Sequence, residues 1–188
     1  MEERIASPLQ ISGSITPPGD KSISHRAVIF NAIAGGTAVI ENYCPGEDGL
    51  STLNVLRELG FSINSYGTDI RIGGGLLTEP KGALDVGNSG TTMRLMAGFL
   101  AGQNFRSCLT GDKSIQSRPM GRIIEPLRLM GAEIDGFQGS QKAPLSIKGG
   151  GLRGIHYRLP IPSAQVKSAL LLAGLFAEGE TVIEQPST

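Results

Sequence analysis

Three short segments of the sequence combine hydroxyl groups, small residues and cations where an apolar helix is expected to begin. They are GDKSISHR at residues 19–26, GNSGTTMR at residues 87–94 and PSAQVKS at residues 162–168. The start of a helix presents free backbone N–H groups and the positive end of the helix dipole, and both stabilise a bound anion. If the three segments meet in the folded chain, they surround one anion-sized volume. We therefore interpret the protein as one that handles phosphate.

The first segment carries the strongest candidate for chemistry. Lys21 stands at the expected start of a helix, where a flexible ammonium group can reach between two bound anions and donate a proton. Ser22 and Arg26 are four residues apart, so they lie on one helical face and can converge on one ligand. The alternative interpretation is a helix capped by Asp20 whose basic residues are simply solvated.

The second segment and the arginine that follows it suggest a place where a ligand meets backbone closely. Asn88 and Gly90 put small groups at a helix start, and a side chain at Gly90 would intrude there. Arg118 precedes a proline that suits a first helical position, so its guanidinium lies at the positive end of a helix. The alternatives are a glycine turn and a solvated arginine. Arg94 lies inside an apolar helix, and we expect it to form a structural ion pair.

The third segment opens a helix with Ser163 and Gln165, whose polar groups face the same expected site. Ordinary capping by the serine is the alternative, since such a cap stabilises a helix by about 1 kcal/mol whatever else it does. His25 and His156 lack the spacing of metal ligands, so we expect each to be a surface residue or a satisfied core residue. The sequence therefore predicts no metal site and no cofactor.

Composition limits the classes of partner. The chain has 188 residues, 39% of them hydrophobic, and 17 basic side chains balance 17 acidic ones. Such a balance attracts neither nucleic acid nor an anionic membrane, so any positive site must be local. The two cysteines, Cys44 and Cys108, lie far apart, which favours reduced thiols. We find no secretory segment and no apolar run of about 18 residues, and we expect a cytoplasmic protein.

Hydrophobic periodicity predicts alternating helices and strands, an α/β (α+β) chain. Ile23, Ala27, Phe30 and Ala34 recur at helical spacing, and the leucines from Leu50 to Leu59 form an expected core ladder. Helices are predicted at 21–34, 48–59, 90–101, 120–130 and 163–177. Strands are predicted at 37–40, 61–65, 68–72, 83–86, 105–109, 132–135, 145–148, 154–159 and 181–184.

The order of elements repeats. LRELGFSI at residues 56–63 can be laid over LRLMGAEI at residues 127–134, which indicates internal repeats. We predict βαβαββ units at about 19–80, 81–150 and 151–188, the last one incomplete, and hence a truncated protein. Residues 9–15 alternate like a strand and are separated from the repeats by Pro17-Pro18-Gly19. Residues 1–18 are thus predicted to be a strand and hinge of another domain.

Four ordered motifs closely resemble the 5-enolpyruvylshikimate-3-phosphate (EPSP) synthase family. They are GDKSISHR, GNSGT, LTGDKS followed by RPM at residues 118–120, and SAQVKSA. Together they span the chain, and four motifs in order are far more specific than one. Ala164 and Leu95 look more like the second, Bacillus-like class of the family. The resemblance implies an inside-out α/β barrel built of βαβαββ units.

The resemblance also implies a reaction and its ligands. The enolpyruvyl group of phosphoenolpyruvate would pass to the 5-hydroxyl of shikimate 3-phosphate through a tetrahedral adduct, in the shikimate pathway to chorismate and the aromatic amino acids. Lys21 is the implied catalytic residue and touches both substrates. The implied ligands of shikimate 3-phosphate are Lys21, Ser22, Arg26, Ser163 and Gln165. Those of phosphoenolpyruvate are Lys21, Asn88, Gly90, Arg118 and Gln165.

In such a family member, further carboxylates and cations come from a second domain that closes over the first. We therefore expect this chain alone to be inactive, its parent to be a monomer, and Gly90→Ala to exclude the inhibitor glyphosate. Two alternatives remain open. One is a UDP-N-acetylglucosamine enolpyruvyl transferase, although the loop from Thr110 to Arg118 lacks the reactive cysteine expected of it. The other is a non-catalytic module that complements a second polypeptide.

Overall fold

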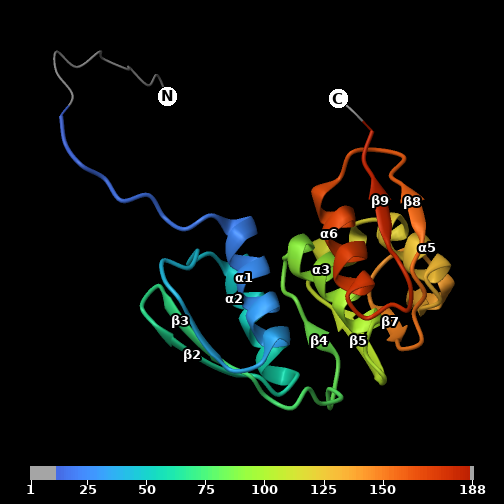
Figure 1. Cartoon of the computed structure of the whole chain (residues 1–188), viewed down its shortest axis with the longest axis horizontal. Coiled ribbons are helices and arrows are strands. Elements are labelled where there is room, and N and C mark those ends of the chain that lie inside the picture. Colours follow the sequence, from blue (N-terminus) through green and yellow to red (C-terminus); the bar gives the residue numbers. More distant parts are fainter. Residues whose placement is uncertain (1–11, 187–188) are drawn as a thin grey trace.

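The structure, a computed structural model, describes residues 12–186, and its first part joins two helices to a small sheet (Figure 1). The three strands pair antiparallel in the order β1-β3-β2. Gly67 adopts a φ of 61° in the tight turn between β2 and β3, a conformation that favours glycine. The elements are α1 (Lys21–Ala34), β1 (Thr37–Ile40), α2 (Glu47–Glu58), β2 (Ser62–Tyr66) and β3 (Asp69–Gly73).

The second part forms a four-stranded sheet in the order β4-β5-β7-β6. Strands β4 and β5 are parallel, and helix α3 makes the crossover that parallel strands require. The other two pairs in this sheet are antiparallel. The elements are β4 (Leu84–Asp85), α3 (Gly90–Ala101), β5 (Arg106–Thr110), α4 (Lys113–Ser117), α5 (Gly121–Leu129), β6 (Glu133–Gly136), the 3-10 turn η1 (Phe137–Gly139) and β7 (Leu145–Lys148).

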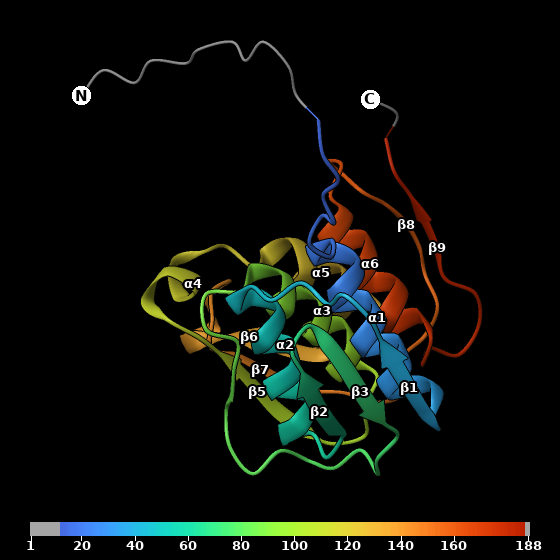
Figure 2. The same ribbon diagram turned by 90° about the vertical axis from the view of Figure 1, so that its left-hand side faces the viewer.

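The third part repeats the strand-helix-strand order of β4, α3 and β5. Strand β8 (His156–Arg158) pairs parallel with β9 (Val182–Glu184), and helix α6 (Ala164–Gly174) connects them. Figures 1 and 2 show α1, α3 and α6 running side by side, with the sheets on the outside of the helices. In Figure 1 the chain enters each of these three helices from the upper end.

Helix α3 is the centre of the core. Only Thr91 and Arg94 among its residues escape full burial, as expected of a helix that is apolar on nearly all sides. Its neighbour α6 comes so close that a Cβ at Gly98 would collide with the backbone carbonyl of Ala169. The lack of a side chain at Gly98 thus lets the two helix backbones meet, and this sets the spacing of their first turns.

Most predicted elements are confirmed, several with the same bounds: α1, β1, α3 and β7 match the predicted ranges. Three expectations were wrong. Residues 12–15 form no strand, and residues 9–11 of that predicted strand lie outside the described residues. The short helix α4 was not predicted. Leu50 was assigned to the core ladder, but it is exposed on α2 while Leu53, Leu56 and Leu59 are buried.

Helix α1 buries a different face from the one that its large apolar residues suggested. Ile23 is 68% exposed and Phe30 is 47% exposed, whereas Ser24, His25 and Val28 are buried. The polar side chains can be buried because Thr52 of α2 and the backbone N–H of Cys44, in the loop before α2, are their hydrogen-bond partners. No helix among the described residues is long and apolar enough to cross a membrane.

Candidate functional site

The start of α1 holds a cation against a carboxylate. The side chain of Asp20 accepts a hydrogen bond from the backbone N–H of Ile23 (2.7 Å) and so caps the helix. One residue later, Lys21 Nζ donates to Asp48 Oδ2 of α2 (2.8 Å), and this contact raises the pKa of Lys21. The Lys21 side chain remains half exposed. An incoming anion would therefore meet an accessible ammonium group that already has one partner.

The predicted pairing of Ser22 and Arg26 on one helical face is only partly realised. Arg26 turns toward α6, where Nη2 donates to Ser168 Oγ (3.0 Å), and Nη1 donates to the backbone carbonyl of Ser22 (3.1 Å). The Ser22 side chain is exposed. The guanidinium thus connects α1 to α6 and has no carboxylate partner among residues 12–186.

At the start of α3 two arginines crowd around a glycine. The side chain of Ser89 caps the helix by accepting from the N–H of Thr92, and Gly90 is buried behind it. A Cβ at Gly90 would lie 2.8 Å from Arg94 Nη1 and 3.1 Å from Arg118 Nη1. The absence of a side chain at Gly90 therefore leaves room for both guanidinium tips.

Arg118 is held by polar groups rather than by an acid. Its Nη2 donates to Asn88 Oδ1 and to Ser114 Oγ, and Asn88 in turn donates to Asp112 Oδ2 (2.7 Å). Asp112 caps α4, and its hydrogen bonds from the Ile115 backbone and the Asn88 side chain lower the pKa of its carboxyl group. The unpredicted helix α4 thus supplies one direct partner of Arg118, Ser114, while its cap Asp112 holds the other, Asn88, which precedes α3.

Arg94 does not form the structural ion pair that we expected. No carboxylate of the described residues lies within salt-bridge distance of it. Its Nη1 instead donates to the Gly90 carbonyl (3.1 Å) and to Gln165 Oε1 of α6 (3.0 Å). Burial, together with the charges of Arg118 and Arg122, lowers the pKa of Arg94. The start of α3 therefore gathers two guanidinium groups that form no salt bridge among the described residues, and Asp112, linked to Arg118 through Asn88, is an acid whose pKa the Arg118 charge helps to lower.

The start of α6 faces this cluster. Ser163 Oγ caps the helix by accepting from the N–H of Val166 at 3.4 Å, a long bond that leaves the hydroxyl hydrogen free to donate. Gln165 reaches across to α3: its Nε2 donates to Thr91 Oγ1 (3.0 Å) while its Oε1 accepts from Arg94. At this helix start Ser163 thus caps the helix while Gln165 contacts Arg94 of the cation cluster.

A buried chain of hydroxyl groups ties α1, α2 and α3 together behind the site. His25 Nδ1 and Thr52 Oγ1 share a hydrogen bond of 2.6 Å, and Thr52 Oγ1 bonds Thr92 Oγ1 (2.7 Å). Thr92 also donates to Ser89 Oγ, the cap of α3. His25 is fully buried, and burial lowers its pKa to about 4, while its Nε2 has no partner among the described residues. His25 is therefore a core residue that is only half satisfied.

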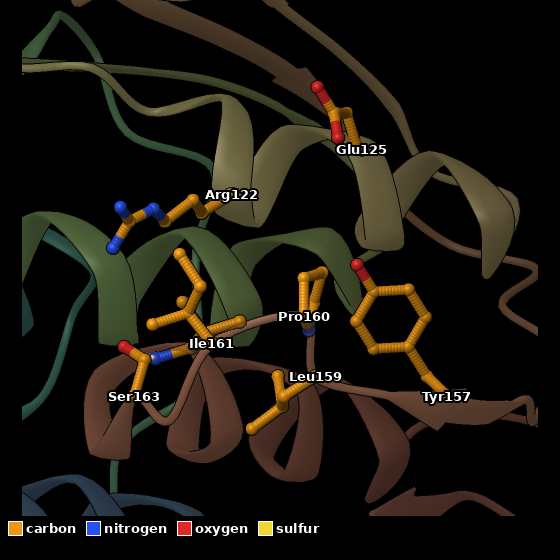
Figure 3. Close-up of a pocket in the computed structure, with 8 residues that line it drawn as sticks. Arg122, Glu125, Tyr157, Leu159, Pro160, Ile161 and Ser163 are labelled. Atoms are coloured by element: carbon orange, nitrogen blue, oxygen red, sulfur yellow. Dashed lines mark hydrogen bonds between the residues drawn. The ribbon is translucent and has the colours of Figure 1, made fainter. Parts of the chain in front are cut away.

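A recess of about 70 Å³ adjoins the starts of α5 and α6. Figure 3 shows Arg122 of α5 and Ser163 at the start of α6 on its two sides, with Pro160 and Ile161 between them. Of the predicted site residues only Ser163 lines it. Among residues 12–186, no group of histidine, cysteine or carboxylate side chains is arranged to hold a metal ion.

Hydrogen bonds connect most of the predicted residues, but through partners that sequence reasoning did not select. Asp48 holds Lys21, Ser168 holds Arg26, and Thr91 and Arg94 hold Gln165. Asp48 and Ser168 lie on α2 and α6, far in sequence from the residues that they contact, so no local pattern marked them. Arg94 was visible in the second segment, but its apolar surroundings suggested an ion pair.

Comparisons with known proteins agree on one family. Residues 5–188 match the family described as EPSP synthase (3-phosphoshikimate 1-carboxyvinyltransferase). A 3-phosphoshikimate 1-carboxyvinyltransferase of Geobacillus kaustophilus is 56% identical over 94% of this chain and 42% of its own length. One of Bacillus anthracis is 53% identical over 99% of this chain and 44% of its own length.

The fold is shared as well. A solved EPSP synthase structure from Acinetobacter baumannii superimposes with a TM-score of 0.90 at 50% identity, over 94% of this chain and 41% of that one. The chain therefore spans about two fifths of the length of the relatives and the structure that it matches.

Proposed function

Because the chain belongs to the EPSP synthase family, we propose that the protein that contains it transfers the enolpyruvyl group of phosphoenolpyruvate to the 5-hydroxyl of shikimate 3-phosphate. The hydroxyl oxygen bonds to C2 of phosphoenolpyruvate while the methylene carbon takes up a proton, which gives a tetrahedral adduct. Loss of phosphate from C2 and of a proton from the methyl group then yields the enol ether. The oxidation states balance without a cofactor.

The observation that carries this proposal is the set of cations gathered at α1 and at the start of α3, with the polar start of α6 facing them. Arg26, Arg94 and Arg118 have no carboxylate partner among the described residues, and Lys21 has one that lies at the surface. Both substrates are multiply anionic. A cluster of guanidinium groups without acids stabilises such ligands and the charge that develops as phosphate leaves.

We assign the residues as the family resemblance suggests. Lys21 contacts both substrates and is the catalytic residue, because its ammonium group is protonated at neutral pH and half exposed, so it can reach a bound anion and donate a proton to it. Ser22, Arg26 and Ser163 bind shikimate 3-phosphate. Asn88, Gly90 and Arg118 bind phosphoenolpyruvate, and Gln165 spans both ligands.

The remaining ligands and the carboxylates for proton transfer are proposed to lie in a second domain, to which residues 1–18 also belong. The described part of the chain is then one domain of βαβαββ units at about 19–80, 81–150 and 151–188. The observed order β4, α3, β5, α5, β6, β7 supports such a unit. In this proposal the 188-residue chain alone releases no phosphate from the two substrates.

The direct test is a steady-state assay of phosphate release. The full-length enzyme should release phosphate only when both substrates are present, and Lys21→Ala should abolish most of this activity. Arg106→Ala is the matched control, because Arg106 is an exposed arginine on β5 outside the site. Release of phosphate without shikimate 3-phosphate, or full activity of Lys21→Ala, would refute the proposal.

Gly90 gives a second test through the inhibitor. A methyl group at Gly90 would press on the tips of Arg94 and Arg118, so Gly90→Ala shifts groups that bind phosphoenolpyruvate and its mimic. We expect the inhibition constant of glyphosate to rise more than the KM of phosphoenolpyruvate does. Equal inhibition of the Gly90→Ala variant and the parent enzyme would contradict this assignment.

A further inference from the structure

Arg94 has an unusual environment for a charged side chain in a core helix. It is half-buried, and its Nη1 donates both to the Gly90 carbonyl in the preceding turn and to Gln165 Oε1 on α6. No carboxylate among residues 12–186 pairs with it. A guanidinium group stays protonated under such conditions and can only donate hydrogen bonds. Arg94 therefore dictates which atom of its partner faces it.

The partner is an amide whose two ends have opposite roles. The Gln165 oxygen can only accept and its nitrogen can only donate, although the two ends have nearly the same shape. With Arg94 on one side, the oxygen must turn to the guanidinium. The nitrogen then points away from it, one N–H donates to Thr91 Oγ1 (3.0 Å), and the second N–H is left over.

The orientation matters because phosphate and carboxylate groups accept hydrogen bonds. An amide turned the other way would place its oxygen against an anionic ligand, which is repulsive. We propose that Arg94 is a positioning residue that locks the Gln165 side chain with its N–H groups toward the anion site. This inference rests on the proposed function, and it adds to it a residue with a defined task.

The close contact between α3 and α6, one turn beyond Arg94 and Gln165, restricts the movement of these two side chains relative to each other. Gly98, one turn beyond Arg94, lets α3 approach the backbone of α6 at Ala169, one turn beyond Gln165. The Gly90 carbonyl holds the same Nη1 atom from the side of α3. A lysine at position 94 would keep the charge, but its single nitrogen on a flexible stem is less able to keep both contacts at once.

The test separates the lock from the charge of Arg94 in the full-length enzyme. The variants are Arg94→Met, Arg94→Lys and Arg122→Met, each alone and combined with Gln165→Met. Arg122 supplies a neighbouring charge that acts on Arg94, and it has no hydrogen bond to Gln165 among the described residues. The readouts are kcat and KM for phosphoenolpyruvate, with the melting temperature measured for each variant.

We expect Arg94→Met to lower kcat/KM for phosphoenolpyruvate by about 10- to 100-fold, as for loss of a charged hydrogen bond. In the Gln165→Met background Arg94→Met should lower kcat/KM by a factor that is at least about fivefold smaller, because the Gln165 amide that Arg94 orients is already absent. Arg122→Met should lower kcat/KM by the same factor in both backgrounds. Arg94→Lys should fall between the parent and Arg94→Met, and its melting temperature should match the parent's.

Equal factors for Arg94→Met in the two backgrounds, or full activity of Arg94→Lys, would overturn the inference. If Arg94→Met does not fold, Gln165→Glu decides. Its carboxylate would still accept from Arg94 but would offer no N–H, so the inference expects a raised KM with no loss of melting temperature. An unchanged KM for Gln165→Glu would contradict it. A parent enzyme without phosphate release refutes the proposed function instead, which keeps the two failures apart.

Discussion

The cations at the start of α1 and those at the start of α3 are held in opposite ways. Lys21 is paired with the carboxylate of Asp48, whereas Arg94 and Arg118 are held by carbonyl, amide and hydroxyl oxygens. A neutral oxygen fixes the direction of a guanidinium without cancelling its charge. The two arginines at α3 therefore have no direct carboxylate partner among the described residues, and only Asp112, reached through Asn88, offsets part of their charge. At α1 the charge of Lys21 is shared with a carboxylate in direct contact.

This difference suggests a division of labour. An oriented cation without a counter-charge suits tight binding of a phosphate or carboxylate group. The carboxylate of Asp48 raises the pKa of Lys21 and so makes it a weaker acid while the pair is intact, and a ligand that displaces this contact frees the ammonium group to donate its proton. Four experiments test this contrast.

The largest effect is expected at Lys21. Lys21→Ala removes a proposed proton donor, and we expect kcat of the full-length enzyme to fall by about 10²- to 10⁴-fold. The binding constant of phosphoenolpyruvate should change much less, since the α3 cluster is intact. Single-turnover kinetics with a binding titration would measure both quantities. A weaker binding constant with an unchanged kcat would mean that Lys21, like the α3 arginines, only binds the substrate and does not act in the chemical step.

The hydroxyl chain that links the two sides should make stability depend on pH. His25 has a pKa of about 4 in the folded chain and 6.5 as its ordinary value, so only the unfolded state takes up its proton between these values. The free energy of unfolding therefore keeps the whole contribution of His25 above pH 6.5 and decreases as the pH drops below this value. At pH 4 it is lower by about 3 kcal/mol. Urea unfolding at several pH values would measure this loss.

His25→Leu should remove that pH-dependent part, even though the variant is less stable at pH 7. The matched control is His156→Gln, since His156 is an exposed side chain that bonds Glu184 at 2.8 Å. An identical pH dependence in His25→Leu and the parent chain would show that His25 is not the titrating group.

A smaller effect is expected at Arg118. Arg118→Ala removes a guanidinium that forms no direct salt bridge among the described residues, and kcat/KM for phosphoenolpyruvate should fall by about 10- to 100-fold, mainly through KM. Competitive inhibition by inorganic phosphate should weaken in parallel. Arg106→Ala again serves as the control. A fall in kcat alone would show that Arg118 acts in the chemical step, as proposed for Lys21, and would contradict the difference between the two sides.

The smallest effect is expected at Asp48. Asp48→Asn removes the counter-charge of Lys21, so the pKa of Lys21 should fall toward its ordinary value. Because the pair lies at the surface, the KM of anionic substrates should drop by only about two- to fivefold. NMR titration of the lysine and steady-state kinetics would measure the two changes. A raised KM would indicate that Asp48 orients Lys21 more than it neutralises it.

Much of the fold could be read from local pattern. The bounds of α3 followed from its apolar run after a serine cap, and the β2–β3 hairpin followed from alternation around a glycine turn. The buried face of α1 could not be read in this way. Ser24 and His25 are buried because Cys44 and Thr52, distant in sequence, bond to them, and the larger Ile23 stays exposed.

In the candidate site, too, local features could be predicted from the sequence and contacts with distant residues could not. The three helix starts and their candidate ligands were visible as motifs, because capping and cation spacing are local properties. What Arg94 does was not visible, since it depends on Gln165, which lies 71 residues further along the chain. A lone arginine in an apolar helix suggested an ion pair, and the structure gives it an amide instead.

The amino-acid sequence alone was enough to place the starts of α1, α2, α3, α5 and α6 to within a residue and to identify the ionisable groups near them, but it did not reveal α4. Tertiary contacts determine which cation has an acid partner and which has none. Helix formation is governed by residues within a turn or two of each other, whereas the partners of a charged side chain depend on which helices come into contact. In this chain that choice follows from the close approach of α3 and α6 at Gly98 and Ala169.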